Sequence, residues 1–351
     1  MPEHAALSPS LPQPAALLHT TRASRAGAVG AGGLLALCLS LPFWSELSTQ
    51  QFAVELLYTL ALAQMWNLLA GYGGMVSIGQ QLYLGLGGYT LVGLSLKLGV
   101  HPFASVLAAA AIAAAIAAPV SVLLFRLQGP YLAVGTWVMA EVVRHLIANV
   151  PALGGGSGVS LTSAVMVIPD AMRDAGTVWL ATLLGFGSVW VVYGLLRSRF
   201  GLALTAIRDS EVASESVGVP VRRVKFWVHI VSAAGCGLVG GLVYLTRLRI
   251  SPDAAFSVDW SATMIFIVII GGIGTIEGPI VGTLVYFGLR ELLADLGAIY
   301  LVVLGALAIG VMLRAPRGLW GSLVQRFDVH VFPVRRRLVE LDGRESREPA
   351  R

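Results

Sequence analysis

Long apolar runs follow one another through most of this 351-residue sequence, and many are about as long as a bilayer-spanning helix. A helix needs roughly 20 consecutive apolar residues to cross the hydrocarbon core of a bilayer. Hydrophobic residues make up 56% of the chain and charged residues 12%, which is more apolar surface than a water-soluble core would bury. The runs are continuous rather than alternating, which argues against a β-barrel. The pattern predicts an all-α polytopic membrane protein.

We expect about ten membrane-spanning helices, and glycine breaks in several runs leave eight to ten open. The predicted ranges are 27–43, 52–70, 80–98, 103–125, 131–149, 177–196, 225–247, 261–275, 279–295 and 298–313. The expected domain plan is a disordered cytoplasmic tail over 1–26, a transmembrane domain over 27–313 with a loop over 197–225, and a basic cytoplasmic tail over 314–351. The first helix is expected to be retained, with cleavage after Ser45 as the alternative.

The formal net charge is +5, and nearly all of the positive charge is arginine. In a membrane protein such an excess is typical of cytoplasmic loops. With the N-terminus inside, Arg126, the loop 197–225 and the chain from Arg314 onward all lie on the cytoplasmic side. No interleaving of aromatic and basic residues suggests nucleic-acid binding. Both termini are therefore expected in the cytoplasm.

The most polar internal segment is LTAIRDSEVASESVGVPVRRVKF, residues 204–226, in that loop. As one helix from about Leu202 to Val217 it would carry an apolar stripe at positions 202, 206, 213 and 217. Arg208, Glu211 and Glu215 would form a charged face, and Gly218 with Pro220 would end the helix. The segment is either a helix that only lies on the lipid surface or a docking element for a cytoplasmic partner. Its mixed charge favours the partner.

Two glycine-rich segments interrupt apolar runs, GYGGMVSIGQQLYLGLGGY at 71–89 and IIGGIGTIEGPIVG at 269–282. Glycine lowers helix stability by about 1 kcal/mol relative to alanine, so such clusters need a reason. One reason is close helix packing through small residues, and the other is a broken helix that lines a polar pathway. The polar residues beside the glycines, Ser77, Gln80, Gln81, Thr275 and Glu277, favour the pathway.

A third polar island lies at 131–158, where Glu141, Arg144 and His145 can share one helix face. Charges inside a span are costly, and pairing lowers that cost. An internal salt bridge that holds helices together and a part of the passage are both open readings. His229 is expected to be a packed histidine rather than a ligand.

Neither of the two lysines, Lys97 and Lys225, follows a glycine, so the sequence has no standard P-loop. Motifs of zinc peptidases, CxxC sites and serine hydrolases are also missing. Cys38 and Cys236 lie in apolar runs and suggest neither a disulfide framework nor a metal site. We therefore expect no catalytic residue, no metal and no cofactor in this chain.

Several blocks of the sequence resemble the branched-chain amino acid ABC permeases of the LivM/LivH type, and the LivM-like subunit most closely. They are GYGGMVSIGQQLYLGLGGYT, YLAVGTWVMAEVVRHLIANVPALGGGSGV, LTAIRDSEVASESVGVPVRRVKFWVHIVSAAGCGLVGGL, VIIGGIGTIEGPIVGTLV and the final RAPRGLWG. They occur in the family's order and cover most of 55–321. Gln80, Gln81 and Tyr83 stand where the family more often has His, Ala and Phe. Branched-chain amino acids, urea, short amides and other amino acids therefore stay open as substrates.

The resemblance implies an ABC importer permease fold with a cytoplasmic coupling helix that sits in a groove of a separate ATPase. It implies that the contact region is Ala206, Ile207, Arg208, Asp209, Glu211, Ala213, Glu215 and Gly218. It also implies a second homologous permease subunit, two cytoplasmic ATPase subunits that bind ATP and Mg, and a periplasmic substrate-binding protein. The expected location is a bacterial inner membrane.

We expect the translocation pathway to involve Ser77, Gln80, Gln81, Thr136, Glu141, Arg144, Gly155, Gly156, Ser157, Gly272, Gly274 and Thr275. The predicted function is ATP-driven import of a small amino acid-like solute, with branched-chain amino acids first among the candidates. An ion-coupled secondary transporter is the alternative, and Glu141 is its best candidate for a coupling acid. An integral membrane enzyme would need a catalytic cluster, and none stands out in the sequence.

Overall fold

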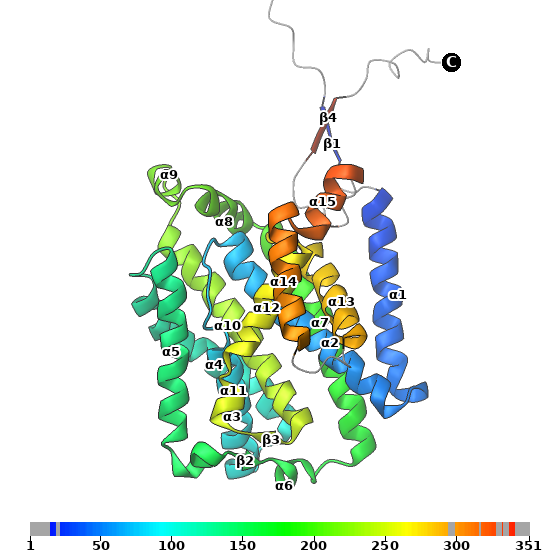
Figure 1. The fold of residues 1–351 in the computed structure, drawn as a ribbon, viewed down its shortest axis with the longest axis vertical. Helices are drawn as coiled ribbons and strands as arrows, with labels where there is room; N and C mark the ends of the chain where they lie inside the picture. Colours follow the sequence, from blue (N-terminus) through cyan, green and yellow to red (C-terminus); the bar gives the residue numbers. More distant parts are fainter. Residues whose placement is uncertain are drawn as a thin grey trace, which may run out of the picture.

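The computed structural model describes residues 15–18, 22–293, 299–315, 317–327, 332 and 337–340. Helices make up nearly all of this part and run mostly along the long direction of the molecule (Figure 1). The two sheets among the described residues are short antiparallel pairs. They are β1 (Ala15–Leu18) with β4 (Arg337–Glu340), and β2 (Val159–Ser160) with β3 (Arg249–Ile250).

A helix lies in each of the ten predicted ranges. These are α1 (Arg22–Trp44), α2 (Leu47–Asn67) with the π-helix η1 (Leu68–Tyr72), α3 (Gln81–Leu91) with the π-helix η2 (Val92–Lys97), α4 (Pro102–Leu124), α5 (Pro130–Ala148), α7 (Asp170–Arg197), α10 (Val221–Arg247), α12 (Val258–Gly271), α13 (Glu277–Leu292) and α14 (Ile299–Arg314). Helix α7 begins earlier than predicted, because charged residues in its first turn continue the helix beyond the apolar run.

Seven helical stretches of the described residues are long and apolar enough to cross a membrane. They are Gly27–Trp44, Leu47–Tyr72, Pro102–Leu124, Pro130–Ala148, Asp170–Arg197, Val221–Arg247 and Pro252–Gly271. The segments α3 with η2, α13 and α14 are shorter. The prediction of an all-α membrane protein is confirmed at the level of seven candidate spans, and the count of ten stays a prediction.

Short elements join these helices. They are the 3-10 turns η3 (Pro151–Leu153) and η4 (Gly155–Ser157), and the helices α6 (Thr162–Val165), α8 (Arg199–Asp209), α9 (Glu211–Ser216), α11 (Pro252–Ala255) and α15 (Gly318–Phe327). Helix α15 lies inside the predicted C-terminal tail and packs against α12 and α13. Residues 1–14, 19–21, 316, 328–331, 333–336 and 341–351 of the predicted tails lie outside the described residues, so the domain plan stays a prediction.

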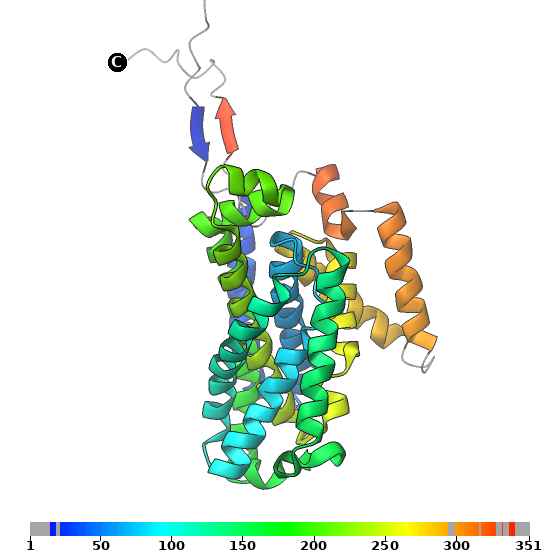
Figure 2. The same cartoon turned by 90° about the vertical axis from the view of Figure 1, so that its left-hand side faces the viewer.

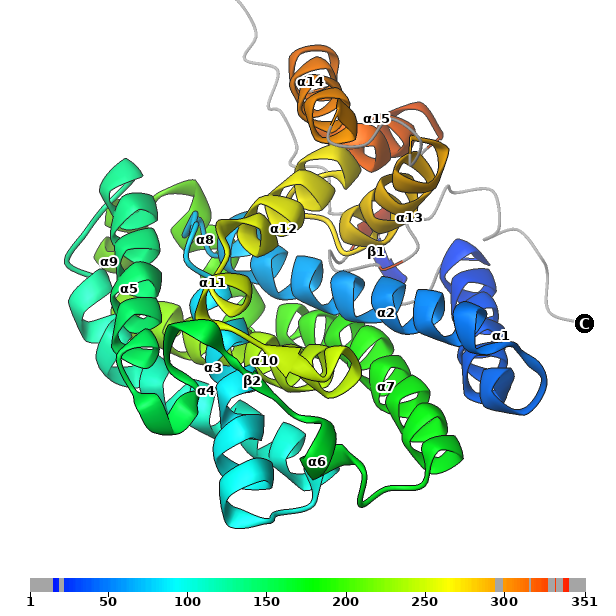
Figure 3. The same cartoon turned by 60° about the horizontal axis from the view of Figure 1, so that its bottom comes forward.

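Helix α2 occupies the centre of the bundle, between α12 and α13 on one side and α7 and α10 on the other (Figure 3). From Leu57 to Tyr72 its side chains are buried on all sides. This stretch is therefore buried all round rather than along one stripe, as expected for a helix at the core of a bundle.

Small residues bring α3, α4 and α10 into close contact. A Cβ added to Gly240 on α10 would overlap the Leu84 carbonyl of α3, and one added to Gly237 would overlap the Ala113 side chain of α4. Membrane helices approach closely where such small residues meet. Helices α3 and α4 therefore pack closely against α10, beside α2.

The two ends of the bundle carry different elements (Figures 1 and 2). Helices α8, α9 and α15 lie at one end, together with the start of α1. The pair β2–β3 and helix α6 lie at the other end. Helices α1 and α5 stand at the periphery, and most of their side chains are not buried within this chain. The end with α8 and α9 is called the loop end below, and the opposite end the hairpin end.

Candidate functional site

Both glycine-rich segments break their helices at the loop end. Helix α2 widens into the π-helix η1, and an irregular segment over 73–80 then leads back to α3. Helix α12 stops at Gly271, and α13 begins at Glu277. Gly74 (φ +66°) and Gly274 (φ +75°) adopt left-handed backbone conformations that favour glycine. π-Helical turns inside α-helices are frequent at functional sites.

Two side chains of α2 hold the loop between α12 and α13. Asn67 accepts a hydrogen bond from the Gly274 backbone nitrogen at 2.9 Å and donates one to the Thr275 carbonyl at 2.8 Å. Gln64 donates to the Ile276 carbonyl at 2.7 Å. An unpaired backbone group away from water is costly, so these amides replace partners that an unbroken helix would supply. Neither Asn67 nor Gln64 was predicted to be a site residue, although each is a polar residue inside an apolar run.

The glycines of the two segments touch each other. A Cβ added to Gly71 would lie 2.7 Å from the Gly274 nitrogen, closer than real Cβ atoms approach. On the far side of the loop, a Cβ added to Gly318 at the start of α15 would overlap the Gly272 Cα. The Gly272–Thr275 loop therefore lies between η1 and α15, and the predicted residues Gly272, Gly274 and Thr275 meet here.

Two hydrogen bonds anchor the irregular segment after η1 in the interior, and a third lies within the segment. The Trp66 indole donates to the Ser77 carbonyl at 2.8 Å, and the Ile78 nitrogen donates to the Thr136 hydroxyl of α5 at 3.1 Å. The Gly79 nitrogen donates to the Ser77 hydroxyl at 3.2 Å. A cavity of about 10 Å³ lies beside Ser77, Thr136 and His229, which is near the lower limit for one water.

Gln80 and Gln81 are fully buried where α3 begins. Gln80 accepts a hydrogen bond from the Cys236 thiol at 3.5 Å, and Gln81 accepts a short one from the Ser261 hydroxyl. The amide nitrogen of each finds no partner among the described residues, and neither does the Gln64 carbonyl oxygen. Buried amide groups are nearly always paired, so these three atoms are exceptions to the usual pattern.

Tyr83 and His229 form a neighbouring buried pair, with 2.7 Å between the tyrosine oxygen and the imidazole Nε2. Phe125 packs edge-on against the His229 ring. His229 is thus a packed and hydrogen-bonded residue between α3, α4 and α10, as predicted. Ser77, Gln80, Gln81 and Thr136 form the interior group of predicted pathway residues.

The remaining predicted pathway residues lie apart from this interior group, toward the hairpin end. Arg144 on α5 pairs with Glu141 at 2.7 Å and with Asp253 of α11 at 2.5 Å, and its Nη2 lies 3.1 Å from His145 Nε2. The pairing of Glu141 with Arg144 within α5 is confirmed, and the second pair, between Arg144 and Asp253, ties α5 to α11. Gly155, Gly156 and Ser157 form η4 beside these two helices.

The loop over 197–225 does not contain the single helix that the sequence predicted. Helix α8 ends at Asp209, Ser210 is extended (φ −160°, ψ 113°), and its hydroxyl accepts a hydrogen bond from the Ala213 nitrogen at the start of α9. The prediction was wrong because Ser210 is a strong N-cap residue that begins a new helix. The predicted end is confirmed, since Gly218 (φ +85°) and Pro220 separate α9 from α10.

The break at Ser210 changes which faces are buried. Leu204, Ile207 and Ser214 pack onto the bundle, whereas Leu202 and Val217 of the predicted apolar stripe are 74% and 79% exposed. Val212 is 76% exposed as well. The prediction that this apolar stripe packs against the bundle is therefore wrong. The two end residues of the stripe, Leu202 and Val217, form an exposed apolar surface together with Val212.

The charged residues of the loop also separate into two groups. Glu211 pairs with Lys225 at 2.6 Å and so ties α9 to α10. The Arg208 guanidinium lies against Gly274. Arg208, Asp209, Ala213, Glu215 and Gly218 are exposed, Ala206 is half-buried, and Ile207 is buried. Ile207 is therefore not available at the surface, and an ATPase contact of the other seven residues stays a prediction.

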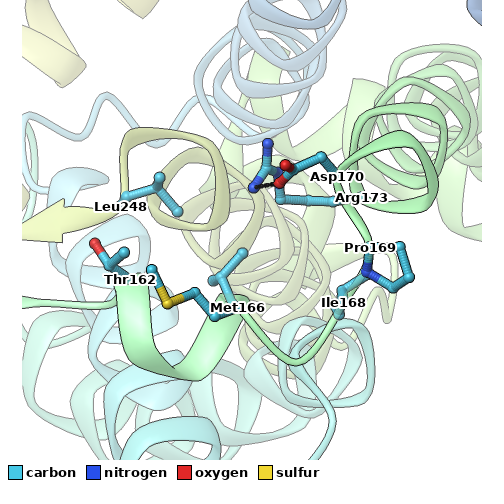
Figure 4. A pocket seen from close by; sticks show the side chains of 8 residues that line it. Thr162, Met166, Ile168, Pro169, Asp170, Arg173 and Leu248 are labelled. Atoms are coloured by element: carbon cyan, nitrogen blue, oxygen red, sulfur yellow. Dashed lines mark hydrogen bonds and ion pairs between the residues drawn. The ribbon is translucent and has the colours of Figure 1, made fainter.

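A cavity of about 320 Å³ opens at the hairpin end, between α6, the start of α7 and the end of α10 (Figure 4). Thr162, Met166 and Leu248 border it opposite Asp170 and Arg173. Arg173 pairs with Asp170 at 2.7 Å and with Asp174 at 3.2 Å, so one positive charge is shared by two carboxylates. Leu248 is the one non-glycine residue of the described chain with a positive φ (57°).

Comparison with known proteins gives a family profile described as "Branched-chain amino acid transport system / permease component", which matches residues 48–312. The chain is 28% identical over 313 residues to the high-affinity branched-chain amino acid transport system permease protein LivM of Escherichia coli (strain K12), covering 82% of this chain and 73% of LivM. The LivM of Salmonella typhimurium is 27% identical with the same coverage.

A more distant relative is the fructose import permease protein FruG of Bifidobacterium longum, which is 28% identical over 151 residues. That match covers 40% of this chain and 44% of FruG. No solved structure matches the chain. The matched region contains both glycine-rich segments and the α8–α9 loop, which are the parts that meet at the loop end.

Proposed function

Because this chain belongs to the family of branched-chain amino acid transport permeases, we propose that it imports a small amino acid-like solute, branched-chain amino acids before others, with ATP hydrolysed by a separate subunit. The chain is the permease component of such an ABC system and not its ATPase. The observation that carries the proposal is the profile match over 48–312, which includes both glycine-rich segments and the α8–α9 loop.

The proposed ATPase-docking surface is the outer face of α8 and α9. Leu202, Val212 and Val217 are exposed there beside Asp209 and Glu215. Exposed apolar residues rimmed by charge are typical of a protein interface. In this proposal two cytoplasmic ATPase subunits bind ATP and Mg, a second homologous permease subunit completes the membrane part, and a periplasmic binding protein delivers the solute.

The proposed pathway passes the interior group at the start of α3. Irregular backbone at membrane depth is tolerated where it is buried in protein or lines a water-filled cavity. The segment over 73–80 is such backbone, and it leads to two buried glutamines with an unpartnered amide nitrogen each. In this proposal Gly71 and Gly274, which touch each other, form a gate at the loop end, and Glu141 and Arg144 of α5 lie near the hairpin end.

We infer that the loop end faces the cytoplasm of a bacterial cell and that all ten helices cross its inner membrane. The α8–α9 loop, α15 and the start of α1 share that end (Figure 1), which supports the proposal that the N- and C-terminal tails lie on the same side as the basic loop. This arrangement agrees with the positive-inside rule. The alternative of ion coupling gains no support from Glu141, because Arg144 already neutralises it.

Uptake by proteoliposomes tests this function. The chain is reconstituted with the products of its neighbouring genes, and entry of radiolabelled leucine is compared with ATP inside, with a proton or sodium gradient alone, and with neither. ATP-dependent uptake that competes with isoleucine and valine supports the proposal. Uptake driven by the gradient without ATP contradicts it, and ATP-driven uptake of urea or another amide instead contradicts the substrate.

A further inference from the structure

Arg208 lies where α8 crosses both glycine-rich segments. A Cβ added to Gly274 would overlap the Arg208 guanidinium and would lie 3.2 Å from its Cζ. The same point is 3.0 Å from the Gly71 carbonyl oxygen, and a Cβ added to Gly74 would lie 3.7 Å from the Arg208 Cα. The main chain of Arg208 therefore adjoins one segment, and its side chain reaches the other.

Arg208 is itself exposed and directly follows the buried face of its helix. Leu204 and Ile207 are 0% and 4% exposed, so this face of α8 is embedded in the bundle. A displacement of α8 must therefore carry the guanidinium with it, relative to the loop between α12 and α13.

We propose that Arg208 is a positioning residue that transmits movement of α8 to the junction of Gly71 and Gly274, rather than a residue that binds the ATPase. This inference rests on the proposed function, because it assumes that an ATPase moves α8. It changes the role that sequence resemblance gave to Arg208, which was contact with that partner.

Arginine suits this position for a physical reason. Its planar guanidinium can lie flat against a glycine, where no Cβ intervenes, and present several donors to neighbouring carbonyl groups. Lysine carries the same charge on a single ammonium and lacks the plane. The structure therefore predicts that the shape of this side chain matters in addition to its charge.

The contact between Gly71 and Gly274 is connected along the main chain to the interior group. Asn67 holds Gly274, and η1 with Gly71 leads through the segment over 73–80 to Gln80 and Gln81. Two side-chain contacts, of Arg208 and of Asn67 with Gly274, begin this route, and continuous main chain completes it. Movement at Arg208 therefore reaches the proposed pathway without passing through the close packing of α3 on α10.

The test uses the reconstituted complex and a probe that needs no solute. Val76, in the segment over 73–80, is 46% exposed and is replaced by cysteine in a Cys38→Ala background, with the fully buried Cys236 kept. Maleimide labelling of Val76→Cys is measured without nucleotide and after trapping with ATP and vanadate. Each variant is also scored for ATPase retained on size-exclusion chromatography and for ATP hydrolysis.

Arg208→Ala is compared with Arg208→Lys and with Arg199→Ala, which removes an exposed arginine from the first turn of the same helix. We expect Arg208→Ala to keep the ATPase and its hydrolysis, while the nucleotide-dependent change in labelling falls at least tenfold. We expect Arg208→Lys to give a partial response and Arg199→Ala to match the parent.

Two results overturn the inference. One is loss of the ATPase from both Arg208 variants, which makes Arg208 a docking residue. The other is an unchanged labelling response in Arg208→Ala, or no response in a parent complex whose ATPase is bound and active. If the parent binds no ATPase at all, the proposed function has failed, and the inference has lost its premise with it.

Discussion

The Gly71 and Gly274 backbones meet so closely that a Cβ on Gly71 would lie 2.7 Å from the Gly274 nitrogen. The two residues belong to separate glycine-rich segments, and each segment ends a helix at the loop end. This contact joins α2, at the centre of the bundle, to the loop between α12 and α13. Arg208 of α8 lies on the same contact.

Gly71→Ala is expected to destabilise the protein, because the new Cβ would overlap the Asn67 side chain as well as Gly274. Overpacking of this kind costs about 1–3 kcal/mol. The thermal midpoint in detergent measures the loss. Gly187→Ala on α7 is the matched control, since its Cβ would have no atom within 4 Å, and it should leave the midpoint equal or higher. Equal effects of the two substitutions would contradict the contact.

Asn67→Leu removes both hydrogen bonds to the Gly274–Thr275 loop. Each backbone group left without its partner costs about 1 kcal/mol, the lower part of the usual range, because the loop is only partly buried. We expect a lower thermal midpoint and faster hydrogen exchange over 272–276. Asn149→Leu removes one exposed bond to the His145 carbonyl and serves as the control. Unchanged exchange in Asn67→Leu would show that the amide does not hold the loop.

The ion pair between Glu55 and Arg290 joins α2 to α13 through two bonds of 2.8 Å. Both side chains are 32% exposed, so removal of one partner should cost about 1–3 kcal/mol, between the values for surface and buried pairs. Glu55→Gln and Arg290→Gln measure this cost, and the double variant measures the coupling. We expect the double variant to lose less than the sum of the two single losses, and strict additivity would exclude a direct interaction.

Glu211→Gln should loosen α9, because Glu211 is paired with Lys225 of α10 at 2.6 Å. Limited proteolysis at Arg222 and Arg223 measures the effect, and we expect faster cleavage than in the parent. Glu215→Gln is the control on the same short helix, where the side chain is exposed, and it should not change the cleavage rate. The assignment fails if the two variants are cleaved at the same rate.

The sequence predicted the helices well because bilayer-length apolar runs and glycine breaks are local signals. It also predicted the pair between Glu141 and Arg144, since their spacing within one helix fixes their distance. It failed at Ser210, where helical periodicity continued through a residue that caps a new helix. Periodicity alone does not show which of two competing local conformations a serine adopts.

The junction could not be derived from local patterns. The contacts of Asn67 with Gly274 and of Gly71 with Gly274 join segments that are far apart in the sequence. Arg208 and Glu211 were placed on one charged face, yet one reaches Gly274 and the other Lys225. Only tertiary packing decides which of these side chains meets which neighbour.

The most direct test of the account is whether a separate ATPase binds the exposed surface of α8 and α9. The chain is co-expressed with its neighbouring genes, and the ATPase that copurifies is quantified for the parent and for Val212→Asp with Val217→Asp. Leu323→Asp, at an exposed apolar position of α15 at the same end, is the control. We predict that the parent and the control retain the ATPase and that the double variant loses it. Retention by the double variant, or absence from the parent, would contradict the account.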